Sequence, residues 1–358
     1  MKILVVGDWH SHLHEEVAAN ALSEIGHEVS RFSWNNYFNS TGLPIWRRYW
    51  LRAQNKYLWG PQVIKLNRDL LAHVAAFQPD VIFIYRGTHI FPTTLRELHS
   101  VASGVVIVGY NNDDPFARGH IAGLWRHFVG GLPELDLALA YRHENIDDFY
   151  KHGARRVELL RSWYVPSLNF PRELSPEERL RFECDVVFIG HFEPDMRLSC
   201  LEEIVSRGWR LRLFGHQDAW EPHLKASQIL SKLAPVHTVW GSEYNAAICG
   251  AKIALCFLSK LNRDSYTRRC FEIPASGAML LSERTADLEG LYQAGTEADY
   301  FSTPDELAAK LDMYLRDDVR RKAVAVAGRK RVMEDGHDVV SRMRTITKWV
   351  EEIKVSRK

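Results

Sequence analysis

The chain is predicted to fold as two α/β units in tandem, each built on a parallel sheet with helices on both faces. Short apolar runs alternate along the sequence with longer segments of helical period, which is typical of such sheets. The length of 358 residues suits two domains better than one core. A segment rich in proline and charge near the middle predicts a linker between the two units.

Apolar runs predict the strands of both units. In the first half they are residues 3–6, 28–32, 81–85, 105–108, 135–140 and 157–160. In the second half they are residues 185–190, 211–214, 236–239, 253–257 and 279–282.

The linker is placed at Trp163–Pro171 and Ser175–Glu178. We therefore expect a first domain of residues 1–165 and a second of residues 166–338. A helical pattern follows Gly336, and we expect this C-terminal helix, within residues 339–358, to cross back to the first domain.

The composition is that of a soluble globular protein, with 46% hydrophobic and 25% charged residues. No apolar run approaches the length of a bilayer span, and the amino-terminal run turns polar too soon for a signal peptide. Five cysteines occur singly with no CxxC pair, which favours reduced core thiols and a cytoplasmic location. A net charge of +1 gives no reason to expect a nucleic acid as partner.

The segment 267–291, TRRCFEIPASGAMLLSERTADLEGL, is the most informative part of the chain. If it is helical, Arg268 or Arg269 shares a face with Glu272. A guanidinium suits a pyrophosphate, and a carboxylate accepts hydrogen bonds from both hydroxyls of a ribose. The pattern therefore indicates a nucleotide diphosphate site, the alternative being a solvated arginine pair beside core residues.

Ligands of open α/β sheets bind beyond the carboxyl ends of the strands. Two such edges that face each other would form a central cleft, where we expect the chemistry. Gly190 and Gly215 end strands at this edge, and the helix after Gly190 would direct its positive end at phosphates.

Several motifs follow one another in a fixed order from Cys184 to about Trp349. They are DVVFIG at 185–190 with Arg197, LFGH at 213–216, VWG at 239–241 with Tyr244 and KIAL at 252–255, and RCFE at 269–272 with ASG at 275–277. This order resembles the CgeB-like group of GT-B glycosyltransferases, within the group-1 glycosyltransferase superfamily. The tail, with DEL at 305–307 and Arg342, and HEN at 143–145 in the first half continue the resemblance.

The resemblance implies a GT-B fold and metal-independent transfer of a sugar from a nucleotide-diphosphate sugar to an acceptor hydroxyl, with no further cofactor. The second domain would bind the donor, and the first a glycan, a lipid-linked or a small-molecule acceptor. Arg269 would stabilise the leaving diphosphate and Glu272 would hold the ribose. The donor site would comprise Gly190, Arg197, Gly215, His216, Trp240, Gly241, Arg263, Arg269 and Glu272.

The sequence departs from the family in one respect. Many group-1 relatives carry a further glutamate before the one matched by Glu272, and this region holds NRDS at 262–265, where Asp264 is the one acid. Two other functions stay open: a nucleotide-sugar epimerase of the same fold, and a non-catalytic nucleotide-sugar-binding protein of glycan assembly.

The first domain offers two candidate bases for the acceptor hydroxyl, Asp114 and His12. Asp114 follows a predicted strand, although Asp before Pro equally predicts a helix N-cap. His12 lies in GDWHSHLH at 7–14, which also resembles the openings of metallophosphoesterases and metal-dependent amidohydrolases. The other metal-binding motifs of those enzymes are not found, so we expect no metal site.

The segment 44–59, PIWRRYWLRAQNKYLW, interleaves aromatic and basic residues. We favour a packed helix whose arginines cover tryptophan rings, or a wall on which an acceptor sugar stacks. The alternative is peripheral contact of Trp46, Arg47, Arg48 and Trp50 with the anionic inner face of a membrane.

Overall fold

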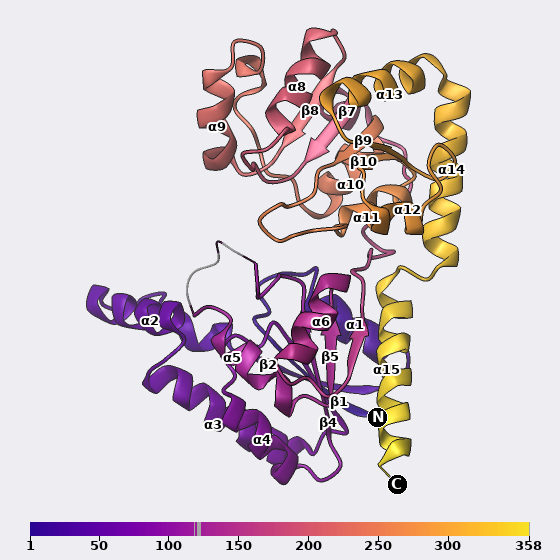
Figure 1. Cartoon of the computed structure of the whole chain (residues 1–358). Helices are drawn as coiled ribbons and strands as arrows, with labels where there is room; N and C mark the ends of the chain where they lie inside the picture. The colour runs from indigo at the N-terminus through magenta and orange to yellow at the C-terminus, as the bar shows by residue number, and fades with distance from the viewer. Residues whose placement is uncertain (118, 120–122, 358) are drawn as a thin grey trace. The chain divides into compact units, whose positions relative to one another are not determined.

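The computed structural model of the chain describes residues 1–117, 119 and 123–357 and divides into two compact units. Unit 1 comprises Met1–Arg161 together with Val339–Lys358, and unit 2 comprises Ser162–Asp338. Each unit has its own parallel sheet (Figure 1). Each also has its own hydrophobic core.

Unit 1 is built on a six-stranded parallel sheet with the order β2-β1-β3-β4-β5-β6. Its central strands are almost continuous apolar runs, as expected where both faces of a sheet are covered by helices. All six strands predicted for the first half of the sequence are confirmed. Their bounds are β1 (Lys2–Gly7), β2 (Glu28–Ser33), β3 (Val81–Tyr85), β4 (Val106–Asn111), β5 (Leu137–Ala140) and β6 (Val157–Leu159).

Helices cover both faces of this sheet. The helices of unit 1 are α1 (Glu15–Glu24), η1 (Asn35–Phe38), α2 (Ile45–Tyr57), α3 (Pro61–Phe77), α4 (Pro92–Val101), α5 (Arg126–Gly131), η2 (Leu132–Glu134), α6 (His143–Lys151) and α15 (Val339–Ser356). Residues of α3, α4, α5 and α6 share one hydrophobic core with one face of the sheet. On the other face α1 and α15 lie side by side, whereas α2 lies at the periphery of the unit (Figure 1).

The C-terminal helix belongs to unit 1, although unit 2 precedes it in the sequence. Val350 of α15 is fully buried. Lys354 Nζ lies 2.7 Å from Asp80 Oδ1, and Arg156 Nη2 lies 2.7 Å from Glu352 Oε2. Buried apolar contacts and these ion pairs hold the end of the chain against the first sheet.

Unit 2 is built on a five-stranded parallel sheet with the order β11-β10-β9-β7-β8. Its strands are β7 (Cys184–Ile189), β8 (Leu211–Phe214), β9 (Ala251–Cys256), β10 (Met279–Glu283) and β11 (Asp299–Phe301). Four of the five strands predicted for this half are confirmed, and the short strand β11 was not predicted.

The strand predicted at 236–239 is wrong. This segment makes only an isolated bridge between His237 and Phe214, and the His237 carbonyl accepts a hydrogen bond from Gly215 N at 3.0 Å. Pro235 and two exposed polar residues, His237 and Thr238, interrupt the apolar pattern. The segment therefore runs past the end of β8 instead of pairing along it.

The helices of unit 2 are α7 (Pro176–Phe182), α8 (Arg197–Ser206), α9 (Gln217–Ala226), η3 (Ser231–Leu233), α10 (Gly241–Cys249), α11 (Arg269–Ala275), α12 (Ala286–Leu291), α13 (Pro304–Arg316) and α14 (Asp318–Glu334). Residues of α8, α9 and α13 share one core with the sheet, and α10, α11 and α14 contact strands β9 and β10. Helix α7 begins within the predicted linker, where Ser175 and Glu178 form a capping box, and continues four residues beyond it.

All five cysteines are free thiols, and four of them are buried, as predicted. In the part of the chain that the structure describes, no helix combines the length and the apolar character that a bilayer span requires.

The packing of α15 predicts a difference between two substitutions in the same helix. Val350→Ala should lower the free energy of unfolding of unit 1 by about 1–3 kcal/mol, because Val350 is fully buried. Val355→Ala is the matched control, since Val355 is 71% exposed and should change the stability by about 0.5 kcal/mol or less. Denaturant unfolding measures both, and equal effects would show that α15 is not packed against unit 1.

Candidate functional site

The strand order of unit 2 reverses at β7, because β8 lies on one side of β7 and β9, β10 and β11 lie on the other. Ligands of open parallel sheets bind beyond the carboxyl ends of the strands at such a switch point. The candidate site is therefore formed by the loops after β7 and β9 and by helix α11.

Arg269, the first residue of α11, lies at this switch point. A Cβ added to Gly190, directly after β7, would lie 3.3 Å from Arg269 Nη1. Cys256, at the end of β9, also lies near Arg269. A hydrogen bond with Cys270 lowers the pKa of the Cys256 thiol, and the positive charge of Arg269 lowers it further. The Nε of Arg269 is buried and has no hydrogen-bond partner. A buried guanidinium is costly unless negative charge lies near it, so this geometry favours an anionic ligand.

Glu272 follows Arg269 by three residues and is 5% exposed. The hydroxyl of Tyr244, on α10, donates to Glu272 Oε2 at 2.6 Å. Burial raises the pKa of the Glu272 carboxyl, and the positive charges of Arg268 and Arg269 oppose this shift. The result is a carboxylate held in a fixed orientation beside two guanidinium groups.

Two histidines, His191 and His216, follow the glycines that come directly after β7 and β8. Partial burial lowers the pKa of His191, and the positive charges of Arg269, His216 and Arg197 lower it further. These groups gather positive charge beyond the strand ends. A ligand with several negative charges would relieve their mutual repulsion.

The ends of β7 and β8 approach each other so closely that side chains are excluded there. Gly190 N donates to Phe214 O at 3.0 Å, and Trp220 Nε1 donates to Gly190 O at 2.8 Å. A Cβ added to Gly215 would lie 2.4 Å from Gly190 O and 2.6 Å from Trp220 Nε1. Glycine at 215 therefore allows the two loops to stand side by side.

Arg197 is buried under the site and is occupied by protein groups. It donates to the carbonyl oxygens of His191 at 3.2 Å and Leu258 at 2.9 Å, and lies 3.6 Å from Glu193 Oε1. It therefore ties the loop after β7 to the loop after β9 and acts as a positioning residue. Asp195 Oδ1 accepts a hydrogen bond from Arg197 N at 3.0 Å, so a carboxylate already occupies the first N–H of the helix end that was expected to face phosphates.

The remaining predicted donor residues, Trp240, Gly241 and Arg263, are exposed. Trp240 is exposed and precedes α10, and Gly241 begins the helix that carries Tyr244, with a φ of 53°. Arg263 is exposed in the loop after β9 and has a φ of 51°, a strained conformation for a residue other than glycine.

The structure thus brings together Gly190, Gly215, His216, Arg269 and Glu272 of the predicted set. Sequence reasoning did not assign His191 and Tyr244 to the site. His191 could have been found because it directly follows a strand-ending glycine. The partnership of Tyr244 with Glu272 joins residues 28 apart, which no local pattern indicates.

The two predicted bases lie in unit 1. Asp114 is fully buried, and its Oδ1 accepts hydrogen bonds from Phe116 N at 3.0 Å and Asn145 Nδ2 at 2.9 Å. Residues 115 and 116 form a turn, so these contacts stabilise a turn and not the helix start that Asp-Pro had suggested. A carboxylate in this position is not accessible to an acceptor in this structure.

The loop after β1 carries the histidines. The side chain of His12 is 89% exposed and contacts the carboxylate of Glu16, whereas His10 Nδ1 lies 3.0 Å from Asp8 Oδ2. His14 stacks on Tyr85, with 3.0 Å between its Nδ1 and the tyrosine hydroxyl. Among the described residues, no three His, Cys, Asp or Glu side chains converge as a metal site requires.

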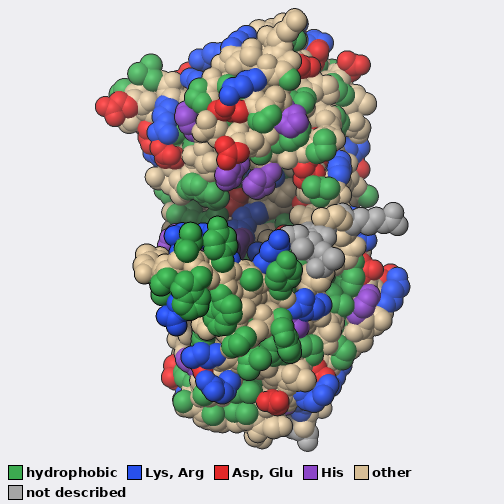
Figure 2. Space-filling model, turned by 90° about the vertical axis from the view of Figure 1, so that its left-hand side faces the viewer, with side chains coloured by type: hydrophobic (Ala, Val, Ile, Leu, Met, Phe, Trp, Pro, Cys, Tyr) green, Lys and Arg blue, Asp and Glu red, His purple; other side chains and the backbone are tan. Residues whose placement is uncertain are grey.

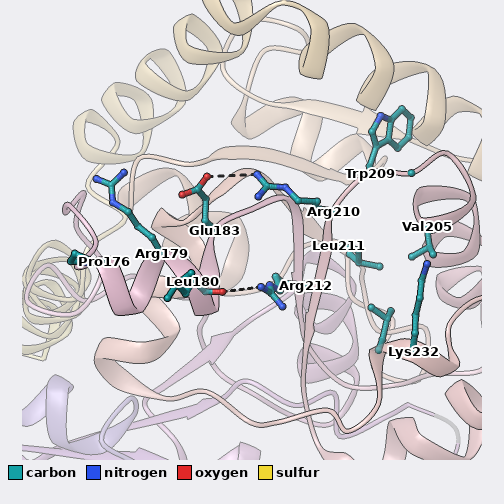
Figure 3. A pocket seen from close by; sticks show the side chains of 12 residues that line it. Pro176, Arg179, Leu180, Glu183, Val205, Trp209, Arg210, Leu211, Arg212 and Lys232 are labelled. Atoms are coloured by element: carbon teal, nitrogen blue, oxygen red, sulfur yellow. Dashed lines mark hydrogen bonds and ion pairs between the residues drawn. The ribbon is translucent and has the colours of Figure 1, made fainter.

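A pocket of about 870 Å³ in unit 2 lies away from the switch point. It is lined by α7, the end of α8 and the start of β8 (Figure 3). Arg210 pairs there with Glu183 at 3.6 Å, and Arg212 donates to Leu180 O at 3.0 Å. Because this pocket lies at the amino-terminal end of β8, it is separate from the cluster around Arg269.

Residues 197–348 match a family described as glycosyl transferase-like. No curated protein matches the chain. Among solved structures, the Anabaena protein HepE in complex with UDP and glucose is 12% identical with a TM-score of 0.68, covering 98% of this chain and 100% of that chain. Sucrose-phosphate synthase from Thermosynechococcus elongatus is 12% identical with a TM-score of 0.70, covering 99% and 100%. A glycosyltransferase from Rickettsia africae is 13% identical with a TM-score of 0.69, covering 98% of each chain.

These similarities concern the fold. Two parallel-sheet, Rossmann-like units of the GT-B type are shown, and the predicted fold class is confirmed.

The contact between strand ends predicts that Gly215→Ala destabilises unit 2. A Cβ at this position meets backbone and a fixed indole, so we expect a loss of about 1–3 kcal/mol. Gly290→Ala is the control, because a Cβ on that helical glycine meets nothing within 4 Å and should stabilise by about 0.5–1 kcal/mol. Thermal unfolding compares the two, and a neutral Gly215→Ala would contradict the close approach.

The pKa of Glu272 predicts a pH-dependent gain of stability in Glu272→Gln. Because folding raises this pKa, the ionised carboxylate destabilises the folded state at pH values above the ordinary value of 4.5. The variant should therefore melt at a slightly higher temperature than the parent near neutral pH, and the difference should vanish below pH 4.5. Glu334→Gln, on an exposed helix face, serves as the control. A destabilised Glu272→Gln at neutral pH would assign Glu272 a structural role.

Proposed function

We propose that the chain is a glycosyltransferase that takes a nucleotide-diphosphate sugar as donor and transfers the sugar to an acceptor hydroxyl. The observation that carries this proposal is the pair Arg269 and Glu272 at the switch point of unit 2. Arg269 places its guanidinium beside Gly190 at the end of β7, and Tyr244 orients Glu272. The glycosyl transferase-like match over residues 197–348 supports it.

In this proposal unit 2 binds the donor. Arg269 binds the diphosphate through charge-assisted hydrogen bonds from its guanidinium, and ring N–H groups of His191 and His216 donate further hydrogen bonds to the phosphate oxygens. Glu272 accepts hydrogen bonds from the ribose hydroxyls, and Tyr244 fixes its orientation. UDP-linked sugars are the first donors to test, because the Anabaena neighbour was solved with UDP and glucose.

The chemical step breaks the bond between the anomeric carbon and the diphosphate oxygen. Negative charge then develops on the leaving diphosphate, and positive groups fixed beforehand stabilise it without reorganisation. In this proposal Arg269 supplies that charge in place of a metal. Unit 1 binds the acceptor, which is a glycan, a lipid-linked molecule or a small molecule, and the loop with His12 is the candidate for proton removal.

The resemblance to the CgeB-like group is kept as part of this proposal. A nucleotide-sugar epimerase or a non-catalytic binding protein would use the same donor cluster. The three functions differ in turnover, since an epimerase consumes donor without an acceptor and a binding protein consumes none.

Binding is tested by thermal shift with five nucleotides: UDP, GDP, TDP, ADP and CMP. We expect one nucleotide to stabilise the protein by about 2.7 kcal/mol at a hundredfold excess over Kd. Arg269→Ala and Glu272→Ala should each weaken its binding by about tenfold to a hundredfold, the usual loss of a hydrogen bond to a charged group. Arg316→Ala and Glu334→Ala, on exposed helix faces, are the matched controls.

Turnover is then measured with the matching nucleotide sugar and an acceptor panel. The proposal expects release of the nucleoside diphosphate that depends on acceptor and is unchanged by a chelator. Binding without turnover on any acceptor would leave a binding protein, and donor conversion without an acceptor would identify an epimerase. Stabilisation by divalent metal with no response to any nucleotide would exclude the donor site.

A further inference from the structure

The expectation that residues 44–59 form a packed helix is wrong. Helix α2 does form, but Leu51 and Gln54 are the buried residues along it. Trp46 is 66% and Tyr49 is 64% exposed, and Ile45, Trp50, Tyr57 and Trp59 are also exposed. One part of the prediction holds, since Arg47 lies over the Trp46 ring at 5.6 Å.

The exposed aromatic side chains form a stripe along α2. Residues 46, 49, 50, 53 and 57 follow the spacing of one helix face, and four of them are Trp or Tyr. An apolar stripe at helical spacing normally faces the core, whereas this stripe faces outward. Seen from the side on which α2 lies in Figure 1, unit 1 shows hydrophobic side chains gathered beside Lys and Arg (Figure 2).

Basic residues flank the stripe without any acidic counterpart. Arg48, Arg52 and Lys56 follow one another at four-residue spacing and therefore share the neighbouring face of the helix. Helix α2 itself contains four Lys or Arg and no Asp or Glu, although the whole chain carries a net charge of only +1. Positive charge without acidic residues is thus a property of α2 itself.

The helix is held firmly at its carboxyl-terminal end. Gln62 N donates to Gln54 Oε1 at 2.7 Å, and the His89 ring lies 2.8 Å from Asn55 Oδ1. His127 Nε2 lies 2.9 Å from the carbonyl oxygen of Leu58, which is itself buried. These contacts anchor one end of α2 to unit 1 and leave its first two turns, residues 45–50, exposed.

We propose that the exposed face of α2 binds the surface of an anionic lipid bilayer. Tryptophan and tyrosine rings settle at the boundary between headgroups and acyl chains, and arginines beside them pair with lipid phosphates. Anionic lipid complements the four positive charges of α2. A second copy of the chain does not, because a symmetric dimer would bring two such basic surfaces together.

The test is cosedimentation with vesicles of phosphatidylcholine alone and of phosphatidylcholine mixed with phosphatidylglycerol. We expect binding to the mixed vesicles, weakened by salt, and little binding to the neutral ones. Arg48→Gln with Arg52→Gln should weaken binding about 25-fold at low salt, at about fivefold for each positive charge removed. Arg316→Gln with Arg320→Gln, in unit 2, is the matched control.

The aromatic stripe is tested separately. Tyr49→Ala and Trp46→Ala should each weaken binding to mixed vesicles by several-fold, whereas Tyr150→Ala, which removes a 49% exposed tyrosine of α6, should not. Failure of the parent to bind anionic vesicles at low salt would overturn the proposal. Self-association of the protein would also overturn the proposal if the α2 variants abolish that association. The same holds for binding of a single-stranded oligonucleotide in preference to vesicles, if the α2 variants abolish that binding. Thermal unfolding of each variant shows that the unit is still folded.

Discussion

The close approach of the ends of β7 and β8, and of Arg269 to them, is the constraint on which the candidate site depends. Gly215 leaves room for the Gly190 carbonyl, and Trp220 fixes that carbonyl by a hydrogen bond. Gly190 in turn leaves room for the guanidinium of Arg269. Larger residues at these two positions would displace the charge from the switch point. Arg197 donates to two backbone carbonyls and so holds the adjoining loops in place. Arg197 therefore supports the position of Arg269 and does not replace it as the charge of the site.

Charged groups near the interior of unit 2 require a physical reason. A buried carboxylate costs stability unless it is paired, and burial raises the pKa of Glu272 in spite of its tyrosine and arginine neighbours. The guanidinium of Arg269 also lies largely buried, beside Gly190 at the end of β7. A site prepared for a diphosphate and a ribose explains both features, because the ligand supplies negative charge to the arginine and hydroxyl donors to the carboxylate.

Exposed aromatic rings on α2 present a similar question in unit 1. A bilayer surface would remove them from water, and an enzyme held there would meet lipid-linked acceptors at high local concentration.

The sequence predicted the sheets well because strands buried on both faces are nearly continuous apolar runs, as in VIFIY of β3. It failed at Val236–Val239, where two valines around polar residues imitate a strand, and at β11, where three residues beginning with Asp299 carry too little pattern. The proximity of Arg269 and Glu272 was predictable because both lie on one short helix. The burial of Arg197 and Asp114 was not, since it depends on Leu258 and Asn145, which are distant in the sequence. The outward orientation of the aromatic face of α2 was not predictable either, because an amphipathic pattern does not show which face packs against the rest of the protein.

The most direct test of the donor site is a comparison of UDP with its 2′-deoxy analogue by isothermal titration, on the parent and on Glu272→Ala. If Glu272 holds the ribose, the parent should prefer UDP by about tenfold or more, because the 2′-hydroxyl donates to a charged carboxylate. Glu272→Ala should then bind the two ligands with equal affinity. A preference for UDP that persists in Glu272→Ala, or equal affinities in the parent, would contradict the assignment of the ribose to this carboxylate.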